Sequence, residues 1–501
     1  MARTITQFHN MNPDVPEWTD ANHMYSLSNV DPLYYLAEGV QEKQKAPLVA
    51  SRTFYNLPAS FTSPIKYIVN SNTPVTFDVF TSHDDGLVSG TQVTRDGGNN
   101  ITGANVFNGG YPAGGVGSTG LDNKMIVFAD KIVVNTLAGY LTTTTINTFG
   151  SGWTSLVFDN VTNPYAYLGR PELAVFLDKV WVSDAYNKST MSAIRGYQNS
   201  GTTIFQVTNL VLNIPDYYTI QKMVNYRNKY LIVAGAYNSF KTSTTTSFQS
   251  SRNFLFFFNG LSKGFQESVE LPATFIDMIM VGSELKLLLQ NKYGQYGVYS
   301  LSGTNVKLEH VIQVGTPQIR PLFSFLGLLG INLVNKGVYV MGETSIGLAK
   351  YIFDAGIYTG MTAGTVDSIL YAFNGTNIYA KNMSGTTPGI GGLVFNDINA
   401  ISQWIPLDNK LTSIDVVYDT APQAVGDYIR ITMDSWGEDQ SDSVLTQVLN
   451  DITSTSKDTR IKTTLDVKGL TPTKARLTIQ THSTGAWRPI IRQIQMNESK
   501  Q

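Results

Sequence analysis

The stretch FLDKVWVS at Phe176–Ser183 repeats the pattern of FADKIVVN at Phe128–Asn135. In both stretches an apolar residue leads into an Asp-Lys turn, and a strand of alternating character follows. Asp and Asn favour such turns because their short side chains tolerate left-handed backbone and form local hydrogen bonds. Each stretch therefore predicts a tight β-hairpin.

The same pattern recurs along most of the chain. It returns as YRNKYLIV (Tyr226–Val233) and NLVNKGVYVMG (Asn332–Gly342), and more loosely as VGSELKLLLQN (Val281–Asn291) and AFNGTNIYAKN (Ala372–Asn382). The turn residues are Asp130, Asp178, Asn228, Ser283, Asn335 and Asn374. Their successive gaps are 48, 50, 55, 52 and 39 residues, a spacing typical of propeller blades. A series of hairpins in one large β-sandwich is the alternative. Neither the WD40 nor the kelch signature recurs.

We predict a mainly β fold with a six-bladed β-propeller and a small β-sandwich or platform domain formed by the N- and C-terminal regions. Residues 1–60 are the N-terminal platform segment, 61–410 the propeller, and 411–501 the C-terminal β-sandwich. A seventh blade forms if Tyr67–Ser82 completes one. Residues 84–123 contain eleven glycines and predict a Gly-rich loop insertion.

Other segments predict local structure. Asp31–Gln44 and Ser441–Ile452 show the spacing of short helices. NFLFFFNG (Asn253–Gly260) is apolar on both faces and predicts a strand buried on both sides. In the C-terminal region, Arg476, Thr478 and Gln480 alternate with Leu477, Ile479 and Thr481, which is typical of a half-exposed sandwich strand.

The composition limits the classes of function. Charged residues make up 15% of the chain, against roughly 25% in ordinary soluble domains, and the formal net charge is −2. A general electrostatic attraction to nucleic acid or anionic membrane is therefore not expected. There are no cysteines, which excludes disulfides and thiolate metal sites. The N-terminus has no apolar signal-peptide core, and Pro321–Val334 is too short for a membrane span. We expect a soluble chain made in a cytoplasm.

Motifs for catalysis are lacking. No P-loop or Gly-x-Ser-x-Gly pattern is present, and the five histidines do not pair at metal-ligand spacing. SHDDGLVS (Ser82–Ser89) matches the core of a sialidase Asp-box once, but that motif is a structural turn. DSWGEDQSDS (Asp434–Ser443) lacks the order of a calcium-binding EF-hand loop. We therefore predict no catalytic, cofactor-binding or metal-binding residues, no cofactor and no enzymatic activity.

Three stretches carry a family resemblance. They are LVASRTFYNLP (Leu48–Pro58), GVYVMGETSIGLAKY (Gly337–Tyr351) and KARLTIQTHSTGAWRPIIRQIQM (Lys474–Met496). With them the chain resembles the tail hub or nozzle proteins of short-tailed bacteriophages. The resemblance implies a β-propeller between N- and C-terminal segments that meet as a platform, and a homohexameric ring that extends the DNA ejection channel.

The same resemblance implies the surroundings of the protein. The partners would be the portal and adaptor proteins and the tail fibres or tip proteins. Double-stranded DNA would pass through the ring without sequence-specific binding. The location would be the virion tail, after assembly in the host cytoplasm. Two alternatives remain. One is a glycan- or receptor-binding propeller that uses Trp153, Trp181 and Trp404, and the other is a propeller glycoside hydrolase.

Overall fold

The computed structural model describes strands and tight turns in two bodies, a propeller and a sandwich. The described residues are 2–5, 24–28, 48–49, 54–60, 65–70, 76–82, 88–95, 101–108, 124–135, 140–145, 154–157, 172–183, 193–199, 204–215, 218–237, 252–262, 264–312, 315–325, 327–344, 347–354, 356–363, 369–382, 397–419, 421–436, 444–453, 461–467, 473–484 and 487–499.

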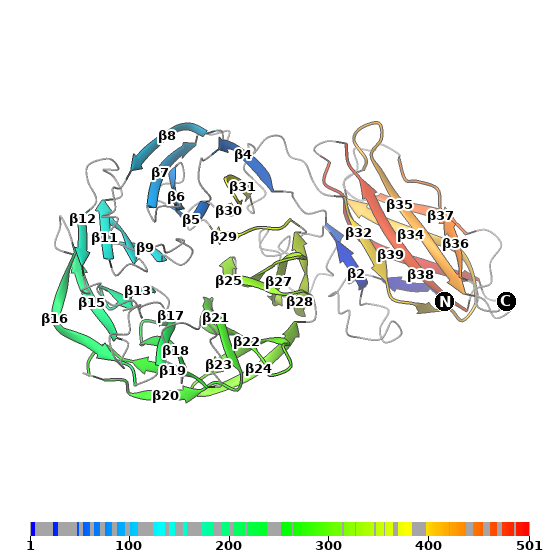
Figure 1. Ribbon diagram of the computed structural model, residues 1–501. Coiled ribbons are helices and arrows are strands. Elements are labelled where there is room, and N and C mark those ends of the chain that lie inside the picture. Colours follow the sequence, from blue (N-terminus) through cyan, green and yellow to red (C-terminus); the bar gives the residue numbers. More distant parts are fainter. Residues whose placement is uncertain are drawn as a thin grey trace.

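Seven four-stranded antiparallel sheets form the propeller within these residues (Figure 1). Blade 1 contains β5 (Ile65–Asn70), β6 (Thr76–Ser82), β7 (Val88–Arg95) and β8 (Ile101–Asn108). Blade 2 contains β9 (Lys124–Phe128), β10 (Lys131–Asn135), β11 (Tyr140–Thr145) and β12 (Thr154–Val157). Blade 3 contains β13 (Leu173–Phe176), β14 (Lys179–Ser183), β15 (Ala193–Asn199) and β16 (Ile204–Asn213). Blade 4 contains β17 (Tyr218–Tyr226), β18 (Tyr230–Tyr237), β19 (Asn253–Phe258) and β20 (Glu267–Glu270).

The remaining blades follow in chain order. Blade 5 contains β21 (Thr274–Val281), β22 (Glu284–Gln290), β23 (Tyr296–Ser302) and β24 (Asn305–Ile312). Blade 6 contains β25 (Pro317–Phe325), β26 (Leu328–Leu333), β27 (Gly337–Thr344) and β28 (Gly347–Asp354). Blade 7 contains β29 (Gly360–Ala363), β30 (Ile369–Asn374) and β31 (Asn377–Asn382), and its fourth strand is the N-terminal β4 (Tyr55–Ser60).

The expected number of six blades is therefore wrong, and the alternative of seven is correct. Four of the repeated turns, at Asp130, Asp178, Asn228 and Ser283, join the first and second strands of blades 2–5. Those at Asn335 and Asn374 instead join the second and third strands of blades 6 and 7. Counting turns thus missed blade 1, whose first two strands fall within Tyr67–Ser82 and its flanks.

The hairpin turns themselves are confirmed. Leu177 and Asp178 both have positive φ, 48° and 55°, and Arg227 and Asn228 both have φ of 55°. Two successive left-handed residues characterise the type I′ turn, whose twist matches that of the flanking strands. The Asp and Asn residues therefore stand where left-handed backbone is needed.

The loop insertion expected at residues 84–123 is only partly correct. Val88–Arg95 and Ile101–Asn108 are the two outer strands of blade 1, and β7 pairs with both β6 and β8. The glycine count concealed these two strands, although Val93 in β7 is fully buried. Residues 84–87, 96–100 and 109–123 lie outside the described part of the chain.

Apolar clusters hold neighbouring blades together. One cluster joins blades 4 and 5 through Leu255, Phe257 and Leu287, among others. Another joins blades 6 and 7 through Phe325, Val340 and Leu370. The strand predicted at Asn253–Gly260 is β19, and Leu255 to Phe258 are all buried, as expected for a strand covered on both faces. Packing between blades therefore supplies most of the propeller core.

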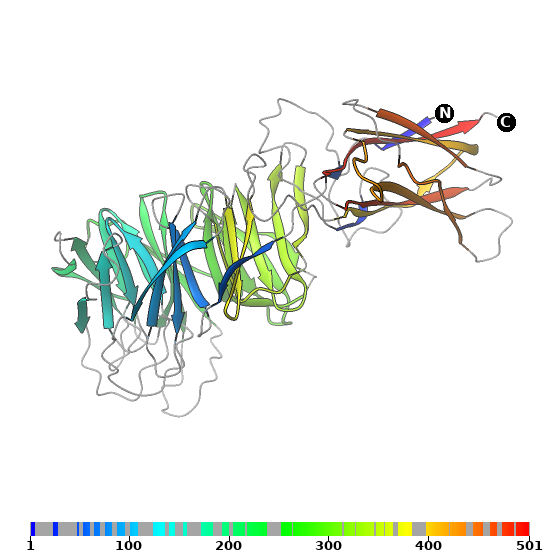
Figure 2. The same ribbon diagram turned by 90° about the horizontal axis from the view of Figure 1, so that it is seen from above.

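Two sheets form the sandwich, and each contains strands from both ends of the chain. One has the order β1-β39-β34-β37, with β3 also paired to β39, and the other has the order β2-β32-β38-β35-β36, with β33 paired to β38. The strands are β1 (Ala2–Ile5), β2 (Met24–Ser28), β3 (Leu48–Val49), β32 (Asn399–Ser402), β33 (Ile405–Pro406), β34 (Lys410–Asp419), β35 (Tyr428–Trp436), β36 (Leu445–Val448), β37 (Ile461–Asp466), β38 (Lys474–His482) and β39 (Ile490–Ser499). The sandwich lies beside the propeller, with β1 and β39 adjacent at its far end (Figure 2).

These sheets divide the chain slightly differently from the expected boundaries at 60 and 410. β4 belongs to the propeller because it pairs with β31, whereas β32 and β33 belong to the sandwich because they pair with β38. The predicted alternation in β38 is confirmed, since Ala475, Leu477 and Ile479 are buried and the residues between them are partly exposed.

The helix predicted at Ser441–Ile452 is wrong. Leu445–Val448 is the edge strand β36, paired with β35. Its apolar residues Leu445 and Val448 are exposed, so their helical spacing reflects no buried helix face. Pairing with an available sheet edge outweighs such a weak local preference. The helix expected at Asp31–Gln44 lies outside the described residues.

Candidate functional site: the charged axis of the propeller

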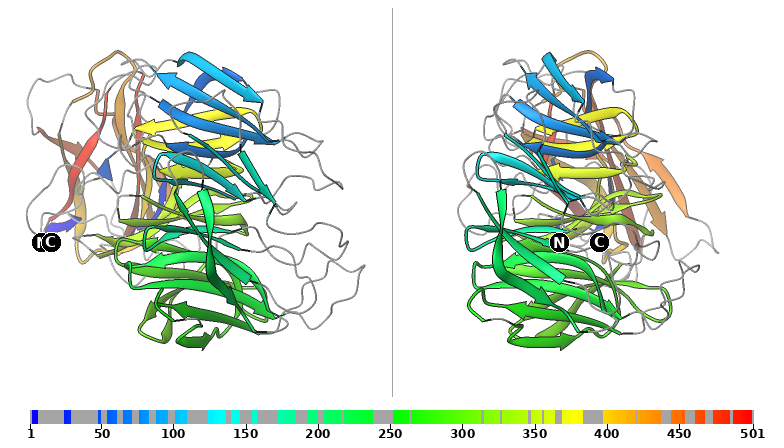
Figure 3. Two further views of the ribbon diagram at one scale, coloured as in Figure 1. Left: turned by 90° about the vertical axis from the view of Figure 1, so that its left-hand side faces the viewer. Right: turned by 60° about the vertical axis from the view of Figure 1, so that its left-hand side comes forward.

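The first strands of the seven blades surround the propeller axis. β5, β9, β13, β17, β21, β25 and β29 contact one another in a closed cycle, each touching the first strand of the next blade. Figure 1 shows the blades arranged around this axis, and Figure 3 shows them from the edge of the propeller. Any group that projects from these strands toward the centre therefore meets groups from several blades.

A charged residue recurs at one register position of these strands. Lys124, Glu172, Lys222 and Asp277 each stand four residues before the last residue of the first strand, in blades 2, 3, 4 and 5. In blade 6 that position is Pro321, and the preceding residue is Arg320. The sign of the charge alternates from blade to blade. Alternation places opposite charges on neighbouring strands, which favours ion pairing.

Two ion pairs join this cluster. Lys222 Nζ lies 2.9 Å from Asp277 Oδ1, between the adjacent blades 4 and 5. Arg320 Nη1 lies 2.8 Å from Glu172 Oε1, which joins blade 6 to blade 3 on the other side of the axis. Glu172 is fully buried and Asp277 is 1% exposed. The pairs thus close the centre of the propeller at this level.

Backbone N–H groups hold the carboxylate of Asp277, whereas Glu172 is held through its own backbone. The Leu322 N–H donates to Asp277 Oδ2 at 3.2 Å, and the Met278 N–H donates to Oδ1 at 2.9 Å. Glu172 exchanges hydrogen bonds with Ser183, whose Oγ accepts from the Glu172 N–H at 2.6 Å. Arg320 has a φ of 50° directly before Pro321, a backbone conformation that is unfavourable for a residue other than glycine. Such strain persists only where surrounding contacts hold it.

The cluster changes the acidity of its members. Burial opposes ionisation of Asp277, but the charge and hydrogen bond of Lys222 and the Leu322 N–H outweigh it, so the pKa of Asp277 lies below its usual value. Burial, and then the like charge of Lys222, lower the pKa of Lys124 to about 8. Lys124 nevertheless keeps partial solvent exposure. The axis therefore holds an Asp277 carboxylate that favours its ionised form, together with one lysine that is partly neutral near physiological pH.

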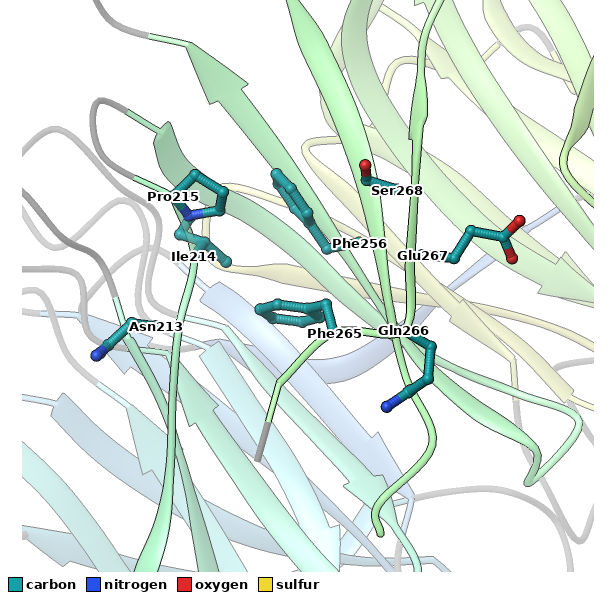
Figure 4. Close-up of a pocket in the computed structure, with 8 residues that line it drawn as sticks. All are labelled: Asn213, Ile214, Pro215, Phe256, Phe265, Gln266, Glu267 and Ser268. Atoms are coloured by element: carbon teal, nitrogen blue, oxygen red, sulfur yellow. The ribbon is translucent and has the colours of Figure 1, made fainter. Parts of the chain in front are cut away.

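A shallow groove of about 530 Å³ lies between blades 3 and 4 (Figure 4). Phe256 and Phe265, with ring centroids 5.4 Å apart, and Ile214 supply apolar walls, and Gln266 and Glu267 stand at its side. The groove contains no charged pair or nucleophile arranged for catalysis among its lining residues.

Of the three tryptophans considered for glycan stacking, the two that the structure describes are buried. Trp181 is 2% exposed, and its indole N–H donates to the Phe176 carbonyl at 3.1 Å. Trp404 is 6% exposed and lies in the sandwich, where Arg476 and Lys474 cover its ring. Trp153 lies outside the described residues.

The other sequence candidates are placed as follows. Ser82 ends β6 and Val88 begins β7, so the Asp-box-like stretch connects two strands of blade 1, although residues 83–87 are not described. Asp434 pairs with Arg476 at 3.0 Å, and residues 437–443 lie outside the described part.

Within the described ranges no group of three His, Asp or Glu side chains is arranged to hold a metal ion. Nor do they contain a helix of the length and apolarity needed to cross a membrane.

Sequence reasoning missed the axial charges, although a signal was present. The stretches KMIVFAD, ELAVFLD, KMVNYRN and DMIMVGS, which begin at Lys124, Glu172, Lys222 and Asp277, each place one charge ahead of an apolar run and the repeated turn. The repeated stretches that were recognised by their turns begin at Phe128, Phe176, Tyr226 and Val281. Each begins four residues after the charged residue, so the charge fell outside the repeat.

Comparison with solved structures found the following similarities. The chain is similar to the β-propeller domain of Cps50 (Swd1) from Myceliophteria thermophila, with 7% identity, a TM-score of 0.43, and coverage of 66% of this chain and 100% of that one. It is also similar to PorZ, a surface component of the type-IX secretion system of Porphyromonas gingivalis, with 11% identity, a TM-score of 0.43, and coverage of 81% and 56%.

A third similar structure is the extracellular domain of the putative hybrid two-component system BT4673 from B. thetaiotaomicron, with 11% identity, a TM-score of 0.40, and coverage of 75% of this chain and 44% of that one. The chain thus spans about half the length of PorZ and BT4673. No family model matches the sequence, and no curated protein matches it.

Proposed function

We propose that the chain is a structural virion protein, a tail hub or nozzle subunit of a short-tailed bacteriophage that forms a ring around the DNA ejection channel. One observation carries this proposal. The N-terminal strands β1, β2 and β3 and the C-terminal strands β32 to β39 make one sandwich, and the propeller is inserted between them. That arrangement is the one implied by the sequence resemblance.

The ion pair across the propeller axis limits where DNA would pass in this proposal. The ion pair between Arg320 and Glu172 joins opposite blades, so a duplex cannot thread along the propeller itself. The channel would instead lie between subunits, at the centre of a homohexameric ring. A net charge of −2 suits such a channel, because a conduit that held phosphates tightly would hinder ejection.

In this role the sandwich docks the portal and adaptor proteins, and tail fibres or tip proteins attach elsewhere on the ring. The axial pairs Lys222–Asp277 and Arg320–Glu172 act as structural groups in this role. The protein has no enzymatic activity in this proposal, and it resides in the virion tail after assembly in the host cytoplasm.

Light scattering on the purified chain tests the proposal. A particle of about six times the 55.1 kDa monomer, ring-shaped in negative stain, supports it. A chain that remains monomeric both alone and with an added portal–adaptor complex contradicts it.

A further inference from the structure

Among the residues that the structure describes, the charges around the propeller axis do not balance. Five of the described charged side chains interact electrostatically there: three are cationic (Lys124, Lys222 and Arg320) and two are anionic (Glu172 and Asp277). The pairs Lys222–Asp277 and Arg320–Glu172 engage both carboxylates. Among the described residues Lys124 makes no ion pair, so the described part of the cluster carries one surplus positive charge.

All three cations keep partial exposure, with the Lys222 and Arg320 side chains each 13% exposed, but Lys124 is the one that makes no ion pair among the described residues. It begins β9 and keeps partial exposure, whereas Glu172 and Asp277 are closed to solvent. Lys222 and Arg320 stand near it and add positive potential. A desolvated ammonium group gains most from an anionic partner because the local dielectric is low.

We propose that the propeller axis binds a small oxyanion, a carboxylate or phosphate group, at Lys124, with Lys222 and Arg320 supplying the surrounding positive potential. The site is distinct from ring assembly and from DNA passage. Glu172 and Asp277 limit it to one compact oxyanion, because a ligand with several separate anionic groups would meet their repulsion.

The lowered pKa of Lys124 is consistent with this site and determines how oxyanion binding depends on pH. Burial and Lys222 lower the pKa of Lys124 to about 8, while Glu172 and Asp277 act in the opposite direction and Arg320 adds to the lowering. An oxyanion beside Lys124 favours the charged form and raises that pKa again. Binding is therefore strongest below about pH 8 and weakens as the pH rises, because the ammonium is lost.

Calorimetric titration of the full chain tests the proposal with two probes, inorganic phosphate and glucuronate, at ionic strength matched with sodium chloride. We expect at least one probe to bind at neutral pH, and Lys124→Gln to weaken it by about tenfold or more. The exposed Lys292→Gln is the control and leaves binding unchanged. Phosphate binding alone indicates a phosphate ligand, and glucuronate binding alone indicates an acidic sugar; either result supports the site.

A second measurement does not depend on the variant. Acetic anhydride at mildly alkaline pH modifies lysines that are partly neutral, and mass spectrometry locates the products. The probe that binds should protect Lys124 and leave Lys292 as reactive as before. Absence of binding by both probes, or binding that is equal in Lys124→Gln and wild type, overturns the proposal.

Discussion

Arg320 of blade 6 and Glu172 of blade 3 form an ion pair across the propeller axis, with Nη1 and Oε1 2.8 Å apart. The arginine is 13% exposed at its side chain and the glutamate is fully buried. The pair links two blades that share no sheet, so it constrains the ring as a whole.

Glu172→Gln should strongly destabilise the chain. It leaves the Arg320 charge buried without its carboxylate, and the loss of one partner of a buried pair costs about 3–5 kcal/mol. Urea unfolding followed by tryptophan fluorescence measures this loss. The control Glu284→Gln breaks a pair with Lys286 in which the glutamate is 57% exposed, and should cost at most about 1 kcal/mol. Equal effects of the two variants would contradict the structural role of the axial pair.

Because Asp277 pairs with Lys222, the free energy of unfolding should depend on pH in the acidic range. The pKa of Asp277 in the folded chain lies below its ordinary value of 3.8, so its contribution is complete above that value and is lost as the pH falls through the lowered pKa. Asp277→Asn should therefore be less stable than wild type at neutral pH. The difference in unfolding free energy should shrink below about pH 4. A difference that stays constant down to the most acidic pH that permits folding would speak against an ionised pair.

Phe54→Ala should weaken the closure of the propeller. Phe54 directly precedes β4 and is 9% exposed; its ring lies 5.1 Å from that of Tyr358 and 5.2 Å from Lys381 Nζ. Loss of a buried phenyl ring costs about 3–5 kcal/mol, and limited proteolysis should then cut blade 7 faster. The control Leu261→Ala removes a side chain that is 88% exposed and should change stability by less than about 0.5 kcal/mol. Unchanged proteolysis of Phe54→Ala would mean that β4 does not close the ring.

Gly330→Ala should destabilise blade 6. A Cβ at this position in β26 would stand 2.1 Å from the ring of Phe323, which is itself stacked on Phe325 and has little room to move. Such overpacking costs about 1–3 kcal/mol. Gly264→Ala is the matched control because nothing lies within 4 Å of its added Cβ. Thermal melts of the two variants check the prediction, and a Gly330→Ala chain as stable as Gly264→Ala would refute the close packing.

The sequence predicted the hairpins because their turns depend on local chemistry. Asp178 and Asn228 sit in left-handed turns that few other residues tolerate, and their spacing shows a repeating unit. The blade count could not be predicted in the same way, since Asn335 and Asn374 occupy a different turn of their blades. Strand pairing over long distances, such as β4 with β31, leaves no local pattern.

The axial charges also show that a local sequence pattern predicts a residue's position but not its long-range partner. Each charge precedes its apolar run at a fixed distance, so Glu172 and Asp277 were visible as a repeat in the sequence. The ion-pair partners of these carboxylates could not be predicted from the sequence. Arg320 meets Glu172 only when seven blades form a closed ring that brings blades 3 and 6 to opposite sides of the axis. Pairing across a closed ring is a property of the complete topology.

Cryo-electron microscopy of the purified chain, with a portal–adaptor complex added if needed, tests the central claim most directly. The account predicts six copies in a ring, with a channel between the copies and seven blades in each. It also predicts that each propeller axis is closed by the side chains of Arg320 and Glu172. Isolated monomers under both conditions, or an open passage along the propeller axis, would contradict it.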